Sequence, residues 1–113
     1  MTGKVQDILI EVKLSSEETK QGIPKHELMA LLNAVREMQH LNLRGLMTMP
    51  PFFPNPQEVR PYFRELRELR DKMALEGFSL PELSMGMSHD FEVAIEEGAT
   101  MVRIGTAIFG ERS

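Results

Sequence analysis

Four short, apolar stretches predict the strands of one sheet: residues 7–14, 43–49, 80–85 and 101–104. In the first two, apolar residues follow one another with few interruptions instead of alternating with polar ones. That pattern is typical of strands covered on both faces, as in a parallel sheet. Helical segments separate the stretches, so strands and helices should alternate with right-handed parallel crossovers.

The first helix is expected over residues 24–39, after a polar loop at residues 15–22. Pro24 suits the first position of a helix, because proline has no N–H to leave unpaired there. Apolar residues recur at helical spacing and give the segment one apolar side. They are Leu28, Leu31, Leu32, Val35 and Met38.

A second helix is expected after a proline-rich run and should end near Gly77. Asn55, with Glu58 three places later, resembles a capping box. Pro61 leaves two alternatives: a regular helix that begins near Arg60, or a kink at the proline. The apolar stripe of this helix comprises Val59, Tyr62, Phe63, Leu66, Leu69 and Met73.

A third, short helix should begin at Ser88, whose hydroxyl has the chemistry of an N-cap. Phe91, Ala94 and Ile95 fall at i, i+3 and i+4 and predict its apolar side. Gly98 is placed to end the helix in a left-handed conformation. A last helical turn is expected to start after the strand at residues 101–104.

The last two predicted strands therefore each lead into a helix N-terminus. Gly86 and Gly105 allow close approach there, and Arg103 and Thr106 lie nearby in the sequence. Two helix N-termini beside a guanidinium suit a phosphate ester, and in βα barrels phosphate commonly lies on the loops after the last two strands. The alternative is ordinary turn chemistry, since glycine and serine are common between strands and helices.

Composition narrows the class of protein. The 113 residues are 42% hydrophobic and 27% charged, which is typical of one globular domain. A net charge of −4 without a basic cluster gives no support to a nucleic-acid partner. There is no cysteine, no apolar run of the roughly 18 residues that a membrane span needs, and no signal-peptide core. We expect a cytoplasmic protein with no membrane association.

Other catalytic and metal-binding patterns are weak. Ser88, His89 and Asp90 have the side chains of a catalytic triad, but consecutive residues at a helix start point in different directions. His26, His40 and His89 lack metal-ligand spacing, so we expect solvated side chains and no metal. Four of the nine methionines lie near strand ends, as core filler or as the lining of a flat aromatic ligand: Met47, Met49, Met85 and Met87.

Several longer motifs recur together. They are Leu-Ser-Met-Gly-Met-Ser at 83–88, Asp-Phe-Glu at 90–92, Glu-Gly at 97–98, Val-Arg-Ile-Gly-Thr-Ala-Ile-Phe-Gly at 102–110, Leu-Arg-Gly-Leu-Met at 43–47 with Pro50, and Glu-Thr-Lys-Gln-Gly at 18–22. With these motifs the chain closely resembles the pyridoxal phosphate homeostasis protein family, the single-domain relatives of the alanine racemase N-terminal barrel.

The resemblance implies a (β/α)8 barrel that holds pyridoxal 5′-phosphate (PLP), has no known catalytic reaction and supports vitamin B6 balance. It implies that Arg103 lies near the pyridine nitrogen and keeps it unprotonated, which weakens the cofactor as an electron sink. The phosphate ligands implied are Ser84, Gly86, Ser88, Gly105 and Thr106.

The resemblance covers the C-terminal half of the family's barrel, about four of eight βα units. We therefore expect residues 1–113 to form a single α/β half-barrel domain, either a natural fragment or a piece cut between repeats. It should supply the phosphate contacts only, and should pair with a second copy or with the missing N-terminal half, because open strand edges and an apolar wall invite association.

No residue matches the family's Schiff-base lysine, and no catalytic acid or base is identifiable, so we do not expect an enzyme. Lys13 lies at the end of a predicted strand and is able in principle to condense with an aldehyde; the alternative is a solvated or ion-paired lysine. The alternative functions are a racemase-like PLP enzyme domain and a generic phosphate-binding half-barrel.

Overall fold

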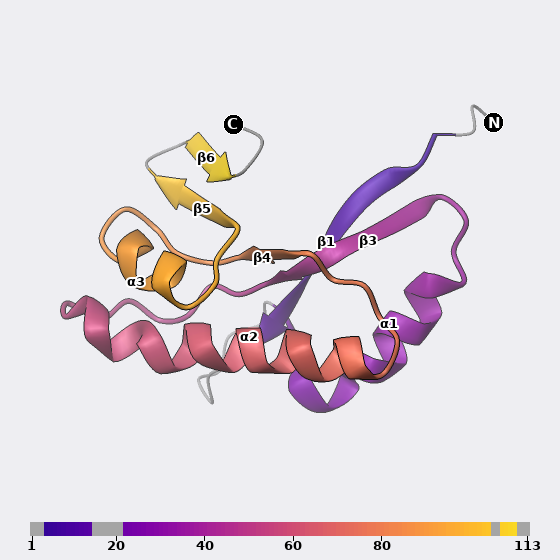
Figure 1. Cartoon of the computed structure of the whole chain (residues 1–113), viewed down its shortest axis with the longest axis horizontal. Coiled ribbons are helices and arrows are strands. Elements are labelled where there is room, and N and C mark those ends of the chain that lie inside the picture. The colour runs from indigo at the N-terminus through magenta and orange to yellow at the C-terminus, as the bar shows by residue number, and fades with distance from the viewer. Residues whose placement is uncertain (1–3, 15–21, 105–106, 111–113) are drawn as a thin grey trace.

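The computed structural model describes residues 4–14, 22–104 and 107–110, the last four by their backbone alone. Within these ranges one sheet has the strand order β2-β1-β3-β4-β5-β6 (Figure 1). The strands are β1 (Gln6–Lys13), β2 (Ile23–Pro24), β3 (Leu41–Met47), β4 (Glu82–Ser84), β5 (Met101–Ile104) and β6 (Ala107–Gly110). The α-helices are α1 (Leu28–Arg36), α2 (Arg60–Leu75) and α3 (Phe91–Glu96). Two 3-10 turns precede α1 and α2, at Lys25–Glu27 and Pro56–Val59.

The predicted parallel sheet is confirmed for β1 to β5, whose neighbouring strands all run parallel. The predicted last helical turn is wrong. Residues 107–110 form β6, which pairs antiparallel with β5, Ala107 opposite Ile104. Their Ala-Ile-Phe-Gly sequence includes residues that favour strands, and only an antiparallel partner can be reached through so short a connection.

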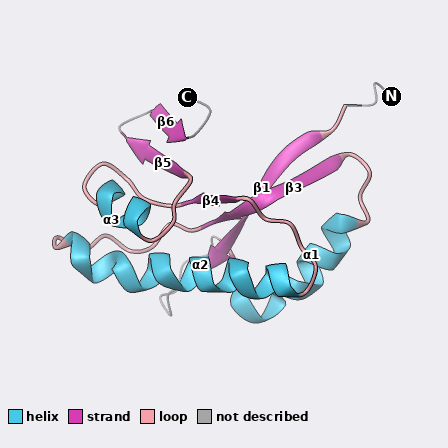
Figure 2. Cartoon of the chain, viewed as in Figure 1, coloured by secondary structure: helices cyan, strands magenta, loops and turns pink. Residues whose placement is uncertain are grey.

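The helices lie on one side of the sheet (Figure 2). Strand residues that face this side are buried, among them Val12, Leu46 and Leu83. Successive side chains on a strand point to opposite faces, so Leu9 and Lys13 belong to the other face, and both are only half-buried. No helix in the described ranges covers that second face. The expectation of strands covered on both faces therefore holds for one face only.

The first helix is shorter than predicted. Pro24 is extended, with ψ 147°, and pairs with Lys13 of β1 as part of β2. Because this pairing holds Pro24 beside the sheet, α1 begins only at Leu28, after the 3-10 turn. Met38 lies beyond the end of α1 and is 49% exposed, so it does not belong to the buried stripe.

The second helix follows the first of the two alternatives, a regular helix that begins near Arg60. It begins at Arg60 and continues through Pro61 in its first turn, and Gly77 lies just beyond its end with a positive φ of 98°. The capping box is not formed as predicted: the side chain of Asn55 accepts the N–H of Gln57, at 3.0 Å. Among the described residues α2 is the longest helix, and none is long and apolar enough to cross a membrane.

The third helix begins three residues later than predicted, at Phe91 instead of Ser88. Residues 88–90 form a turn, and Ala94 is buried as expected. Ile95 is 54% exposed, however, and Val93 is buried in its place, so the buried side is not the predicted one. Gly98 has a φ of 106°, in agreement with the predicted helix end.

A buried carboxylate joins α3 to α2. The Glu97 side chain accepts hydrogen bonds from Arg60 at 2.8 Å, from Arg64 at 3.2 Å and from Arg67 at 3.1 Å. Hydrogen bonds from Arg64 and Arg60 hold the pKa of Glu97 below its ordinary value, while burial opposes the shift. Arg60, Arg64 and Arg67 of α2 therefore form an ion cluster around this one carboxylate.

We expect Glu97→Gln to lower the free energy of unfolding by about 1–3 kcal/mol at neutral pH, because charge-assisted hydrogen bonds are lost. The folded-state pKa is lowered, so the stabilisation is complete above the ordinary pKa of 4.5 and is lost as the pH falls through the folded-state value below it. The difference between the two proteins should therefore shrink in acid. Urea unfolding at several pH values measures it.

Glu96→Gln is the matched control, because Glu96 is exposed and its ion pair within the described ranges is with Arg60. It should change stability by less than about 1 kcal/mol. A pH-independent difference for Glu97→Gln would contradict the assignment.

Candidate functional site

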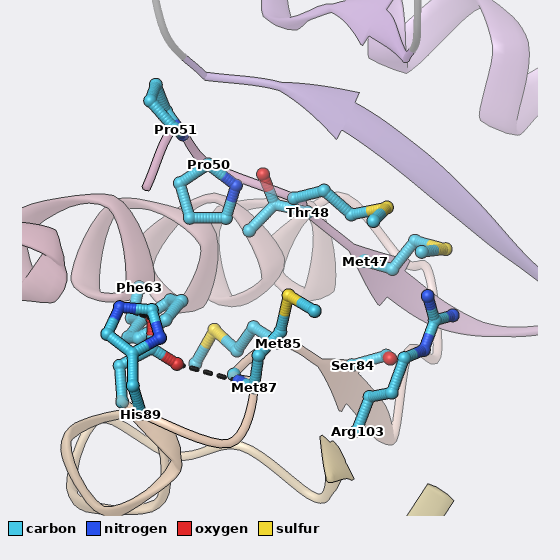
Figure 3. Close-up of a pocket in the computed structure, with 13 residues that line it drawn as sticks. Met47, Thr48, Pro50, Pro51, Phe63, Ser84, Met85, Met87, His89 and Arg103 are labelled. Carbon is cyan, nitrogen blue, oxygen red and sulfur yellow. Dashed lines mark hydrogen bonds and ion pairs between the residues drawn. The ribbon is translucent and has the colours of Figure 1, made fainter. Parts of the chain in front are cut away.

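An open pocket lies at the C-terminal ends of β3 and β4 (Figure 3). Its walls come from the segment after β3, the segment after β4, helix α2 and strand β5. The carboxyl ends of parallel strands are where ligands bind in barrels of this kind. The lining residues are Met47, Thr48, Met49, Pro50, Pro51, Phe63, Ser84, Met85, Gly86, Met87, His89, Asp90 and Arg103.

The turn after β4 fixes the floor of the pocket. Ser84 ends β4 and is half-buried, and Gly86 has a φ of 105°, in the left-handed region that glycine adopts readily. A Cβ at Gly86 would lie 2.6 Å from the Cβ of Ala94. The glycine is therefore required for the close packing of α3 on the turn, a reason that differs from the predicted approach of phosphate.

Arg103 projects from β5 at the level of this turn. Its backbone N–H donates to the Gly86 carbonyl at 2.9 Å, and its side chain extends past Ser84 toward Met47 (Figure 3). No carboxylate among the described residues pairs with its guanidinium. The other arginines in the described ranges all have partners. Arg103 therefore presents a cation at the pocket that is suited to an anionic or acceptor group.

The segment over residues 85–90 closes on itself by two hydrogen bonds. The Met87 N–H donates to Asp90 Oδ1 at 2.7 Å, and the Asp90 N–H donates to the Met87 carbonyl at 3.1 Å. Ser88 lies in this segment but is exposed and does not line the pocket.

His89 connects the two segments that border the pocket. Its Nε2 lies 3.2 Å from the Phe53 carbonyl oxygen, and its ring centroid is 4.5 Å from that of Phe52. His89 is exposed, as expected for a solvated side chain, but it also contacts a segment that lies 36 residues earlier. In the described ranges, no group of histidine and acidic side chains is arranged to hold a metal ion.

The methionines near strand ends all line the pocket. Met85 is 2% exposed and belongs to the core, whereas Met49 and Met87 are 45% and 46% exposed and border the opening. Together with Pro50 they give the pocket an apolar wall beside its few polar groups. Such a combination suits a flat, partly apolar ligand with one charged end.

Three polar lining residues were missed in the sequence: Thr48, His89 and Asp90. The Thr48 hydroxyl is buried and donates to the Val12 carbonyl at 3.0 Å, so it ties β3 to β1. The only sequence feature that could have indicated Thr48 as a lining residue is its position directly after a predicted strand. Lys13 does not line the pocket.

Residues 2–113 match the family model described as the N-terminal domain of alanine racemase. The chain belongs to the alanine racemase N-terminal domain family. This confirms the resemblance carried by the motifs.

Known members of this family are similar over nearly all of the chain. The pyridoxal phosphate homeostasis protein of Aquifex aeolicus is 60% identical over 109 residues, which are 96% of this chain and 48% of that protein. The protein of the same name from Vibrio cholerae is 44% identical and matches 93% of this chain and 44% of its own length. The chain therefore spans about half the length of these curated relatives.

A solved structure shows the same arrangement. PipY of Synechococcus elongatus, with PLP bound, has a TM-score of 0.82 and 32% identity, and the match covers 92% of this chain and 49% of PipY. The predicted fold class is confirmed: this is an α/β chain that corresponds to about half of an alanine racemase N-terminal, TIM-type fold.

The structure brings together three of the predicted site residues, Ser84, Gly86 and Arg103. Ser88 lies beside them on the same segment, outside the lining. Gly105 and Thr106 lie outside the described residues.

We expect Gly86→Ala to destabilise the chain by about 2–4 kcal/mol, because a left-handed backbone and a clash with Ala94 act together. Gly77→Ala is the control for backbone strain alone. Gly77 has a φ of 98°, but a Cβ there would meet nothing within 4 Å. This variant should lose only about 1 kcal/mol. Equal losses in thermal or urea unfolding would contradict the packing role of Gly86.

Proposed function

We propose that the chain supplies the phosphate-binding part of a PLP site, and that the protein to which it belongs serves vitamin B6 homeostasis through binding instead of catalysis. The observation that carries the proposal is the pocket at the ends of β3 and β4, with the Arg103 guanidinium facing it. The proposal is further supported by 60% identity to a pyridoxal phosphate homeostasis protein and by a PLP-bound structural relative.

The donor groups at the pocket fit a phosphate ester. The Ser84 hydroxyl and the segment after β4 supply hydrogen-bond donors, and phosphate oxygens accept such bonds strongly. Ser84, Gly86 and Ser88 are the phosphate ligands that we propose within the described ranges. Gly105 and Thr106 complete the proposed set.

The remaining lining fits the ring. Bound PLP supplies an electron-withdrawing pyridine ring, and an arginine beside its nitrogen leaves that nitrogen unprotonated, so the ring is a weak electron sink. We assign this position to Arg103, and assign the ring's apolar contacts to Met47 and Met87. No lysine is among the lining residues in the described ranges, which favours non-covalent binding by this part of the site.

The uncovered face of the sheet is proposed as the surface that a partner covers. Leu9 and Met47 are half-buried apolar residues on this face, and Lys13 and Arg103 give it charge. Parallel sheets are normally covered on both faces. A second copy of the chain, or the other half of the barrel, would meet that requirement and would also close the pocket, since Arg103 lies on the same face. A cytoplasmic location stays a prediction.

Arg103→Gln should weaken PLP binding about tenfold or more, because a charge-assisted contact is lost. Its effect on inorganic phosphate should be smaller, since we place the guanidinium near the ring. Ser84→Ala should instead weaken both probes to a similar extent. Calorimetric titration with each probe measures these affinities.

Lys72→Gln, which removes one exposed positive charge from α2, is the control and should bind both probes as the wild-type chain does. Wild-type affinity for PLP in Arg103→Gln would refute the assignment of this residue. Equal affinity of the wild-type chain for phosphate and PLP would indicate a generic phosphate site.

The wild-type chain should associate as its concentration rises, and Leu9→Glu should reduce this association, because it places a charge on the uncovered face. Leu75→Glu, at the highly exposed C-terminal end of α2, is the matched control and should associate as the wild-type chain does. Sedimentation velocity over a wide concentration range measures the effect. A stable monomer at high concentration would count against self-association.

A further inference from the structure

Asp90 is an acidic side chain at a pocket for which we propose an anionic ligand. It is only 6% exposed and contributes to the lining. A carboxylate near phosphate oxygens is electrostatically unfavourable, because like charges repel. Its presence there requires a reason other than ligand charge.

The Asp90 carboxylate forms its hydrogen bond with the segment before it and does not cap the helix after it. Asp90 occupies the N-cap position of α3, yet its side chain makes no capping hydrogen bond. It accepts the Met87 N–H at 2.7 Å instead, the bond drawn as a dashed line in Figure 3. The Asp90 N–H returns a hydrogen bond to the Met87 carbonyl at 3.1 Å, so the turn is held from both sides.

The second carboxylate oxygen connects this turn to the other wall. Asp90 Oδ2 lies 3.6 Å from His89 Nε2, and the same nitrogen lies 3.2 Å from the Phe53 carbonyl oxygen. The His89 imidazole therefore lies between Asp90 and the segment after β3. Among the described residues, the N–H groups of Gly86 and His89 have no hydrogen-bond acceptor, so this turn retains donors for a ligand.

We propose that Asp90 is the positioning residue of the phosphate-binding turn, acting as a hydrogen-bond acceptor that holds residues 85–90 in their binding conformation. This inference rests on the proposed function. The role requires an oxygen atom at this position but not a negative charge. That distinction separates it from a purely electrostatic role.

Two substitutions test the distinction. Asp90→Asn keeps an oxygen acceptor of similar shape and removes the charge, so it should bind phosphate and PLP at least as tightly as the wild-type chain. Asp90→Ala removes the acceptor and should weaken both affinities about tenfold or more. Asp71→Ala, which removes an exposed carboxylate on α2, is the control and should leave binding unchanged.

Amide hydrogen exchange in the ligand-free chain provides a readout that does not depend on binding. The Met87 amide should exchange about tenfold or more faster in Asp90→Ala than in the wild-type chain, and should stay protected in Asp90→Asn. Amides of α2 should be unaffected in both variants, which shows that the fold is intact.

The outcomes separate this proposal from the proposed function. If the wild-type chain binds neither phosphate nor PLP, the proposed function fails. Hydrogen exchange at the Met87 amide then still tests whether Asp90 keeps residues 85–90 in their conformation. Full binding by a folded Asp90→Ala, or loss of binding in Asp90→Asn, would overturn the positioning role. If Asp90→Ala does not fold, Asp90→Asn alone decides, because it retains the acceptor.

Discussion

The hydrogen bond from the Arg103 N–H to the Gly86 carbonyl, 2.9 Å long, sets the geometry of the candidate site. β4 ends at Ser84, but this bond and the one from the Met85 N–H to the Met101 carbonyl continue the strand pairing past that end. The turn after β4 is therefore held at the height of the Arg103 side chain. Only a residue that tolerates a left-handed backbone and has no Cβ fits at Gly86. As a consequence, the Ser84 hydroxyl, the turn at Gly86 and the Arg103 guanidinium all lie at the pocket.

The turn also depends on the helix after it. Helix α3 has six residues, too few to be stable alone, so its place must come from tertiary contacts. Ala94 packs against Gly86 at one end, and at the other end the buried Glu97 accepts hydrogen bonds from α2. A buried ion cluster contributes little net stability compared with apolar packing, but its geometry is specific. It fixes α3 against α2, and with it the segment that Asp90 closes.

The sequence pattern was sufficient to predict those features that depend on neighbouring residues alone. The parallel strands, α2 and the place of Arg103 at a strand end follow from apolar runs, helical spacing and strand direction. Features set by distant partners were not predictable. Pro24 is held in β2 by its pairing with β1. The later start of α3 has a local cause instead, because the Asp90 side chain accepts the Met87 N–H and holds residues 88–90 in a turn. His89 was missed at the site for the same reason as Pro24, since its contact with Phe53 spans 36 residues.

If a partner covers the uncovered sheet face as proposed, its association is coupled to ligand binding. Glu82 on this face is buried and already bonded to Thr100 at 2.7 Å, so the face is not simply a surface adapted to water. Ser84 and Arg103 lie on the same face, and both line the pocket. A partner that covers the face must therefore exclude water from the pocket as well, which strengthens each polar contact there. By linkage, a ligand that binds the closed pocket more tightly must strengthen association by the same factor.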